Sequence, residues 1–202
     1  GVDIDGQDDS YDFGSGAGFY VDATKPKWAK HYRMYSYVTT ELPDLVLGQL
    51  PLDKERMSLM GHSMGGHGAL ICALKNPGRY RSVSVFSAIC HPSQCDWGIK
   101  AFTGYLGKAN VTSAWHAYDA TELIQRYAGP HLPILLDQGD ADDFLKSKQL
   151  LPDHLISALQ DCPNRDQLDL ESRVRPGYDH SYFYIQTFVA EHINFHAKYL
   201  LA

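Results

Sequence analysis

The residues best suited to chemistry stand where an apolar segment meets a glycine-rich one. Gly61-His-Ser-Met-Gly65 is a G-x-S-x-G pattern, in which a strand turns at once into a helix and exposes a strained serine at the corner. Gly61 and Gly65 would allow the close backbone approach that this turn needs. A glycine-rich turn with an inert serine is the alternative, which the flanking segments disfavour. We therefore predict Ser63 as a nucleophile, with the Met64 N–H directed at a developing oxyanion.

A serine nucleophile needs a base, and the base needs an acid that orients it. His180 lies in Gly177-Tyr-Asp-His-Ser-Tyr182, between the last predicted strand and the last predicted helix, and we predict it as the base. Four aspartates compete for the role of acid: Asp137, Asp140, Asp142 and Asp143. Asp137 comes too early, within a strand. The residues alone leave the choice among the other three open, because loop aspartates are commonly solvated or cap a helix.

Metal binding is not predicted from the remaining histidines and aspartates. His192 and His196 are four residues apart on a helix, but the glutamate of a zinc protease motif is absent. The acidic segment 1–12 lacks the sixth-position glycine and the late glutamate of a calcium loop. We expect no cofactor and no metal. His62 is expected to pack or to line the rim of the site, and the other histidines to be surface or packing residues.

The elements that must position these residues alternate between strand and helix. Strands are predicted at 56–60, 82–86, 133–137 and 168–174. Helices are predicted at 35–47, 68–74, 122–127, 149–159 and 182–200. Segment 88–117 shows no strong period and is expected to be irregular, and 13–19 is expected to form a tight surface turn. The alternation predicts one α/β domain over residues 1–202, with a mainly parallel sheet covered by helices on both faces.

Composition narrows the function classes. The 202 residues include 18 Lys and Arg and 24 Asp and Glu, which gives a net charge of −6 without any basic block. Nucleic acid is therefore a poor candidate partner. The longest apolar run is too short to cross a bilayer, so no membrane association is expected. Four cysteines without a Cys-x-x-Cys pair indicate reduced thiols and a cytoplasmic location, and Cys72 is expected to be buried on a helix.

Beyond these patterns, nearly the whole chain resembles the S-formylglutathione hydrolase (esterase D) family, which has an α/β-hydrolase fold. The markers are long matches in order, and they include 12–24, 32–38, 61–70, 104–107, 118–121, 137–139 and 177–182, together with Trp97-Gly98 and Ala101-Phe102. The order Ser63, Asp142, His180 is the order that this fold requires. The resemblance implies Ser63 as nucleophile, His180 as base and Asp142 as acid. It also implies a cytosolic thioesterase that converts S-formylglutathione to glutathione and formate in formaldehyde detoxification, without a metal and often as a homodimer.

The chain departs from this family at its beginning. Compared with the family it lacks roughly 80 N-terminal residues, about a third of an ordinary sheet domain of this kind. That segment would hold the first strands and the loop that gives the second oxyanion N–H. Its absence would leave the strand before Ser63 as an exposed apolar edge. We therefore expect the functional protein to contain such a segment, on the same chain or as a separate one.

A few residues are candidates for the wall of a substrate pocket. Trp97 and segment 88–117 are candidate pocket walls, although a core aromatic would explain Trp97 equally well. Lys25, Lys27, Lys30 and Arg33 form the densest positive group, which a solvated face would explain. A broad carboxylesterase or an acyltransferase remains an alternative, because these enzymes share the acyl-enzyme chemistry of a thioesterase. A non-catalytic binding protein is disfavoured because all three triad residues are present.

Overall fold

Four parallel strands form the centre of the molecule in the computed structural model, which describes residues 2–108 and 112–202. Their order in the sheet is β1-β2-β3-β4, the same as their order in the chain. The strands are β1 (Leu59–His62), β2 (Val83–Phe86), β3 (Leu132–Gly139) and β4 (Leu168–Arg175). Every residue of β3 is buried, as its continuous apolar run predicts for a central parallel strand.

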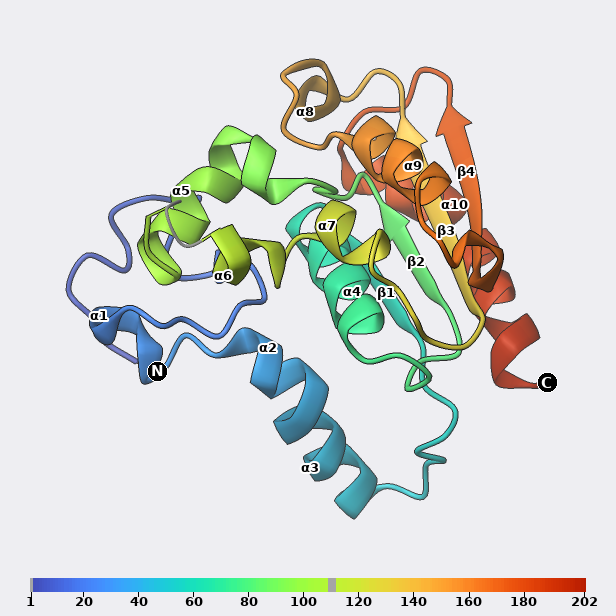
Figure 1. Cartoon of the computed structure of the whole chain (residues 1–202), viewed down its shortest axis with the longest axis horizontal. Coiled ribbons are helices and arrows are strands. Elements are labelled where there is room, and N and C mark those ends of the chain that lie inside the picture. Colours follow the sequence, from blue (N-terminus) through green and yellow to red (C-terminus); the bar gives the residue numbers. More distant parts are fainter. Residues whose placement is uncertain (1, 109–111) are drawn as a thin grey trace.

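Helices connect and cover these strands (Figure 1). Those that precede β2 are α1 (Pro26–Ala29), α2 (Met34–Ser36), η1 (Tyr37–Glu41), α3 (Leu42–Gln49) and α4 (Met64–Lys75). Between β2 and β3 lie η2 (Pro92–Gln94), α5 (Asp96–Tyr105), α6 (Thr112–His116) and α7 (Ala120–Ile124). The remainder are α8 (Asp143–Lys146), α9 (Pro152–Gln160), η4 (Arg165–Gln167) and α10 (Tyr182–Leu200). No helix among the described residues combines the length and apolarity that crossing a membrane requires.

Both faces of the sheet are covered, as the sequence predicts. Helices α4, α7 and α9 lie in front of the sheet in Figure 1, and α10 lies behind it. Alternation along β2 explains the two layers: Val83 and Val85 join the core cluster with α4 and α7, whereas Ser84 and Phe86 meet α10. The carboxyl ends of β1, β2 and β3 lie next to one another at the same end of the sheet. Ligands of parallel sheets commonly bind beyond these carboxyl ends.

The sheet has two different edges. β4 carries charged side chains, and Arg173 pairs with Glu171 and with Glu191 of α10. β1 carries no ionised side chain, and Met60 within it is 47% exposed. Charges on an edge strand oppose pairing with another chain, so only the β4 edge is protected in this way. The expectation of an exposed apolar edge at the strand before Ser63 is met in the described structure.

Segment 88–117 differs from the prediction of irregular structure, because it contains η2, α5 and α6. In α5 the buried residues are Gly98, Ala101, Phe102 and Tyr105. Their spacing is that of one helix face, but the period is obscured in the sequence because Gly98 lies on that face and the apolar Ile99 is exposed. Residues 109–111, which also belong to this stretch, lie outside the described residues.

The predicted surface turn at 13–19 is also wrong in part, since the segment is built into a second core cluster. Phe13 stacks on Tyr105, with ring centroids 4.4 Å apart, and Phe19 is buried. The Gly14 N–H donates to the Tyr105 hydroxyl at 2.8 Å. Close aromatic packing of this kind holds the N-terminal loop against α5.

The predicted helix at 35–47 is present but not uniform. It runs as α2, the π-helical turn η1 and α3, and Figure 1 shows it extending away from the sheet. In η1 the Leu42 N–H donates to the Tyr37 carbonyl, which widens the helix by one residue. Such π-turns are often found at functional sites, and Tyr37 and Glu41 of this turn line a cavity described below.

Candidate active site

Ser63 stands at the sharp turn between β1 and α4. Its φ is +58° and its ψ is −120°, a strained conformation for a residue with a side chain. The turn is fixed on both sides, because the Ser63 N–H donates to the Phe86 carbonyl at 2.9 Å and the Ser63 carbonyl accepts from the His67 N–H at 3.0 Å. The sheet and the helix together therefore hold the serine in its strained form.

The two glycines of the motif are not equally constrained. A Cβ at Gly61 would stand 2.1 Å from the Gly65 carbonyl oxygen, which is far inside contact distance. A Cβ at Gly65 would meet only the Tyr20 hydroxyl, at an ordinary 3.6 Å. The expectation that both glycines are needed for close approach is therefore correct for Gly61 and wrong for Gly65.

His180 lies in the loop before α10, and its Nδ1 is 2.7 Å from Asp142 Oδ2. Asp142 is fully buried; Oδ1 accepts the Phe144 N–H at 2.8 Å, and Oδ2 accepts from the Gln138 amide at 3.2 Å. Burial opposes ionisation of Asp142, but the hydrogen bond from His180 and the remaining donors outweigh it, so its pKa lies below the ordinary value. An ionised, oriented carboxylate at Nδ1 leaves Nε2 as the basic nitrogen of His180.

The other three aspartates are held elsewhere. Asp137 accepts from Arg175 and from the Tyr184 hydroxyl beneath the sheet. Asp140 accepts the Gly177 N–H at 2.6 Å, and Asp143 pairs with Lys146 at the surface. Of the four candidates, Asp142 alone contacts His180 in the described structure. Asp142 is also the N-cap of α8, so the same carboxylate both caps a helix and orients His180.

His62, the residue before Ser63, contacts the predicted base. The His62 and His180 rings are 4.4 Å apart, and Phe144 contacts His180 from another side at 4.6 Å. Burial, reinforced by the proximity of His180, lowers the pKa of His62 to about 4, so this ring is neutral at pH 7. Within the described residues Ser63 Oγ forms no hydrogen bond to His180, and such contacts often form only with substrate present.

A second serine–histidine contact lies deep in the molecule. His196 of α10 bridges the hydroxyls of Ser82 and Ser84, with its Nδ1 and Nε2 each 2.7 Å from one oxygen. Both serines are fully buried on the sheet, and neither lines a described cavity. Asp137, the nearby carboxylate, lies 3.5 Å from His192 Nε2 rather than against His196. We therefore interpret this group as packing between α10 and the sheet.

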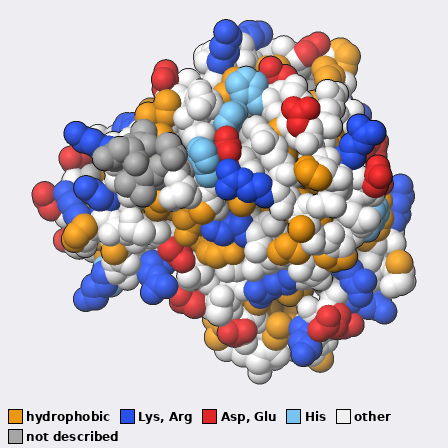
Figure 2. All heavy atoms as spheres, viewed as in Figure 1, with side chains coloured by type: hydrophobic (Ala, Val, Ile, Leu, Met, Phe, Trp, Pro, Cys, Tyr) orange, Lys and Arg blue, Asp and Glu red, His pale blue; other side chains and the backbone are white. Residues whose placement is uncertain are grey.

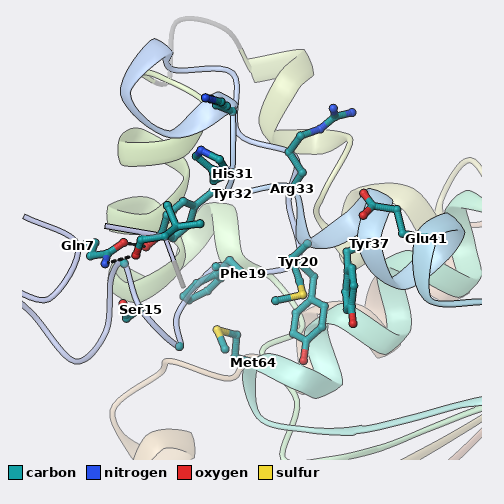
Figure 3. A pocket seen from close by; sticks show the side chains of 16 residues that line it. Gln7, Ser15, Phe19, Tyr20, His31, Tyr32, Arg33, Tyr37, Glu41 and Met64 are labelled. Carbon is teal, nitrogen blue, oxygen red and sulfur yellow. Dashed lines mark hydrogen bonds between the residues drawn. The ribbon is translucent and has the colours of Figure 1, made fainter. Parts of the chain in front are cut away.

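Two cavities meet beside the start of α4. The larger has a volume of about 670 Å³, and Figure 3 shows Phe19, Tyr20 and Met64 on one side of it. The smaller, of about 150 Å³, shares Gly16, Phe19 and Met64 with the larger and is mostly apolar. Trp97 lines the smaller cavity and contacts Phe144 at 4.7 Å, so the structure places it in a pocket wall.

The larger cavity is a feature that the sequence alone did not disclose. Its walls come from the N-terminal loop, from the segment between α1 and α2, and from η1. The signal in the sequence was the glycine-dense stretch 13–19, whose packed backbone forms part of the lining. That stretch read as a surface turn because glycine density alone does not distinguish a free turn from a tightly packed one.

Comparisons with known proteins relate the chain to one group. The Esterase family model matches residues 1–195. The S-formylglutathione hydrolases of Bos taurus and Mus musculus are 59% and 58% identical over all 202 residues, which span 70% of each relative. A solved structure of an S-formylglutathione hydrolase from Agrobacterium tumefaciens has a TM-score of 0.86 and 44% identity, over 94% of this chain and 66% of that one.

A ferulic acid esterase structure, with a TM-score of 0.60 over 90% of this chain and 64% of its own, is only 20% identical and indicates a shared fold alone. The fold is that of an α/β-hydrolase, as the parallel sheet and the elbow at Ser63 indicate. With high identity over its whole length, the chain belongs to the S-formylglutathione hydrolase family of esterases.

Proposed function

We propose that this protein hydrolyses S-formylglutathione to glutathione and formate through Ser63, His180 and Asp142. The observation that carries this proposal is the 2.7 Å contact between His180 and Asp142 beside the strained turn at Ser63. Family membership supports the thioester as substrate, because the relatives of 58–59% identity bear the name S-formylglutathione hydrolase. The chain spans 70% of the length of those relatives.

In the first half-reaction Ser63 Oγ attacks the formyl carbonyl carbon, while His180 Nε2 takes the hydroxyl proton. The carbonyl oxygen becomes an oxyanion, and the N–H of Met64, the first residue of α4, would donate a hydrogen bond to it. Collapse of this intermediate breaks the carbon–sulfur bond, and His180 returns the proton to the departing glutathione thiolate. Asp142 holds His180 in one tautomer and stabilises its cation throughout.

In the second half-reaction water replaces the thiol. His180 accepts a proton from water as the water oxygen attacks the formyl-Ser63 ester, and gives that proton to Ser63 Oγ as the ester bond breaks. Formic acid leaves and loses its remaining acidic proton to solvent to give formate. The small apolar cavity beside Met64 suits a group as small as formyl. The four cysteines are free and buried, which agrees with a reducing compartment, and we propose that the protein acts in the cytoplasm.

The test compares Ser63→Ala with Ser82→Ala in the intact protein. Ser63→Ala should lower turnover of S-formylglutathione by about 10⁴-fold, whereas Ser82→Ala should retain most of the activity of the folded enzyme. Each variant is assayed on S-formylglutathione and on p-nitrophenyl acetate, with circular dichroism as the check on folding. A wild-type enzyme that is equally active on both would favour a general esterase, and loss of activity in folded Ser82→Ala alone would contradict Ser63 as nucleophile.

A further inference from the structure

The larger cavity carries an unusual set of charges for a chain of net charge −6. Lys30 and Arg33 both line it, and His31 lies between them. Glu41, in η1, contributes a carboxylate to the same lining. Figure 3 shows Arg33 and Glu41 on the side of the cavity opposite to Met64. Arg33 and Glu41 therefore stand apart from the end at which the Ser63 chemistry would take place.

The positive group found in the sequence divides into two pairs in the structure. Lys30 and Arg33 line the cavity, whereas Lys25 and Lys27 do not. Lys27 instead lies 3.8 Å from Asp5 and 5.2 Å from the ring of Trp28. A solvated face accounts for the second pair, but it does not explain why both residues of the first pair line a cavity.

The backbone that carries Lys30 and Arg33 is fixed by its neighbours. The Tyr32 carbonyl accepts the Ala23 N–H at 2.8 Å, and the backbone of Arg33 forms an isolated antiparallel β-bridge with that of Asp22. The Tyr32 ring stacks on Tyr105, with centroids 5.4 Å apart. A charged group on a held backbone loses less freedom when it binds a ligand than one on a mobile loop. This segment is thus organised before any ligand arrives.

The chemistry of glutathione matches this arrangement. The tripeptide carries two carboxylates, at the glycyl and γ-glutamyl ends, and one ammonium, while the thioester sulfur lies between them. A cavity of about 670 Å³ falls within the range that holds small-molecule ligands. A formyl group at Ser63 would direct the peptide away from Met64, toward the two cations. The Glu41 carboxylate would then be available to pair with the ammonium of glutathione.

We infer that Lys30 and Arg33 bind the carboxylates of the glutathione part of the substrate and so set the preference for glutathione thioesters. The inference rests on the proposed function and deepens it, because it assigns the part of the site that recognises the leaving group. Lys30 and Arg33 take no part in bond making. Their contribution lies in KM, and raised salt weakens it because the lining is open to water.

The experiment compares two double variants of the intact protein that lose the same charge on the same segment. Lys30→Gln/Arg33→Gln removes the cavity cations, and Lys25→Gln/Lys27→Gln is the matched control. Each is assayed on S-formylglutathione and on S-formyl-N-acetylcysteamine, a thioester without carboxylates. We expect the cavity variant to raise KM for S-formylglutathione about tenfold or more, with little change in kcat and none in KM for the other thioester. The control should resemble the wild type on both.

A binding measurement separates this inference from the proposed function. Glutathione is titrated calorimetrically onto Ser63→Ala, with and without the two cavity substitutions. If the cavity substitutions weaken glutathione binding about tenfold, the result supports the site, whichever substrate the enzyme prefers. Equal affinity in both proteins, or equal loss on both thioesters, would overturn it. A wild type that binds glutathione but shows no preference for its formyl thioester would refute the proposed function and the role of the two cations in substrate preference, and would leave only the glutathione-binding site standing.

Discussion

At the scale of single residues, Asp142 serves two neighbours at once. Its Oδ1 caps α8, and its Oδ2 holds His180 at 2.7 Å. A buried carboxylate that accepts several donors stays ionised and fixed in orientation, which a general base requires of its partner. Among the described residues, the side chain of Asp140, two residues earlier, accepts only the Gly177 N–H in the loop. The same substitution at the two positions should therefore give very different enzymes.

Asp142→Asn should lower kcat/KM by about 10³-fold or more, because the amide presents the wrong partner to His180 Nδ1 and favours the unproductive tautomer. Asp140→Asn should cost less than about tenfold, since an amide oxygen can still accept the Gly177 N–H. Both are measured by steady-state hydrolysis of S-formylglutathione, with thermal unfolding as the control for folding. Comparable losses in the two variants would show that the acid has been assigned to the wrong aspartate.

At the scale of elements, the turn between β1 and α4 depends on one glycine more than on the other. Gly61 faces the backbone of Gly65, where no side chain can move aside. Gly65 lies in the first turn of α4 and faces only the Tyr20 hydroxyl. The G-x-S-x-G pattern requires glycine at both positions, but in the packed structure only Gly61 lacks room for a side chain.

Gly61→Ala should therefore destabilise the fold by at least about 2 kcal/mol and lower activity by about 100-fold, because the turn must open and displace Ser63. Gly65→Ala should change the free energy of unfolding by less than about 1 kcal/mol, since alanine favours a helix and finds room. Urea unfolding and S-formylglutathione hydrolysis measure the two effects. A well-folded, active Gly61→Ala protein would contradict the close approach seen at the turn.

Some elements of the fold can be predicted from the sequence, whereas contacts between distant segments cannot. The predicted positions of β2, β3, β4 and α10 agree with the structure, because continuous apolar runs and helical spacing are local signals. The loop positions of His180 and Asp142 follow from those elements. The contact between His62 and His180 could not be predicted, since it depends on how a loop after β4 crosses the end of β1. The packed loop at 13–19 and the larger cavity are likewise products of long-range packing.

At the scale of the whole molecule, charge is distributed without a dominant patch on the face that Figure 2 shows, where acidic and basic side chains are interspersed. Two histidines are instead buried inside the fold. His67 is fully buried, with its Nε2 2.9 Å from the Phe19 carbonyl, and His196 joins α10 to the sheet through Ser82 and Ser84. Each ring connects separate parts of the fold while it remains neutral.

Burial lowers the pKa of both His67 and His196 to about 4. In the unfolded chain these rings take up protons near the ordinary histidine pKa of about 6.5, whereas in the folded protein they stay neutral down to about pH 4. The unfolded state thus binds more protons within that window, and stability must fall as pH falls from about 6.5 to about 4. Each ring can contribute up to about 1.4 kcal/mol per pH unit there.

Urea unfolding midpoints between pH 7.5 and pH 4.5 should therefore decrease steeply, and His196→Gln should flatten the slope because one buried titrating ring is lost. His131→Gln is the matched control, since His131 is exposed and its replacement should leave the slope unchanged. Above pH 7 the His196→Gln protein should be less stable than the wild type, because the link between α10 and β2 is weakened. A slope that is the same in all three proteins would mean that His196 does not couple folding to pH.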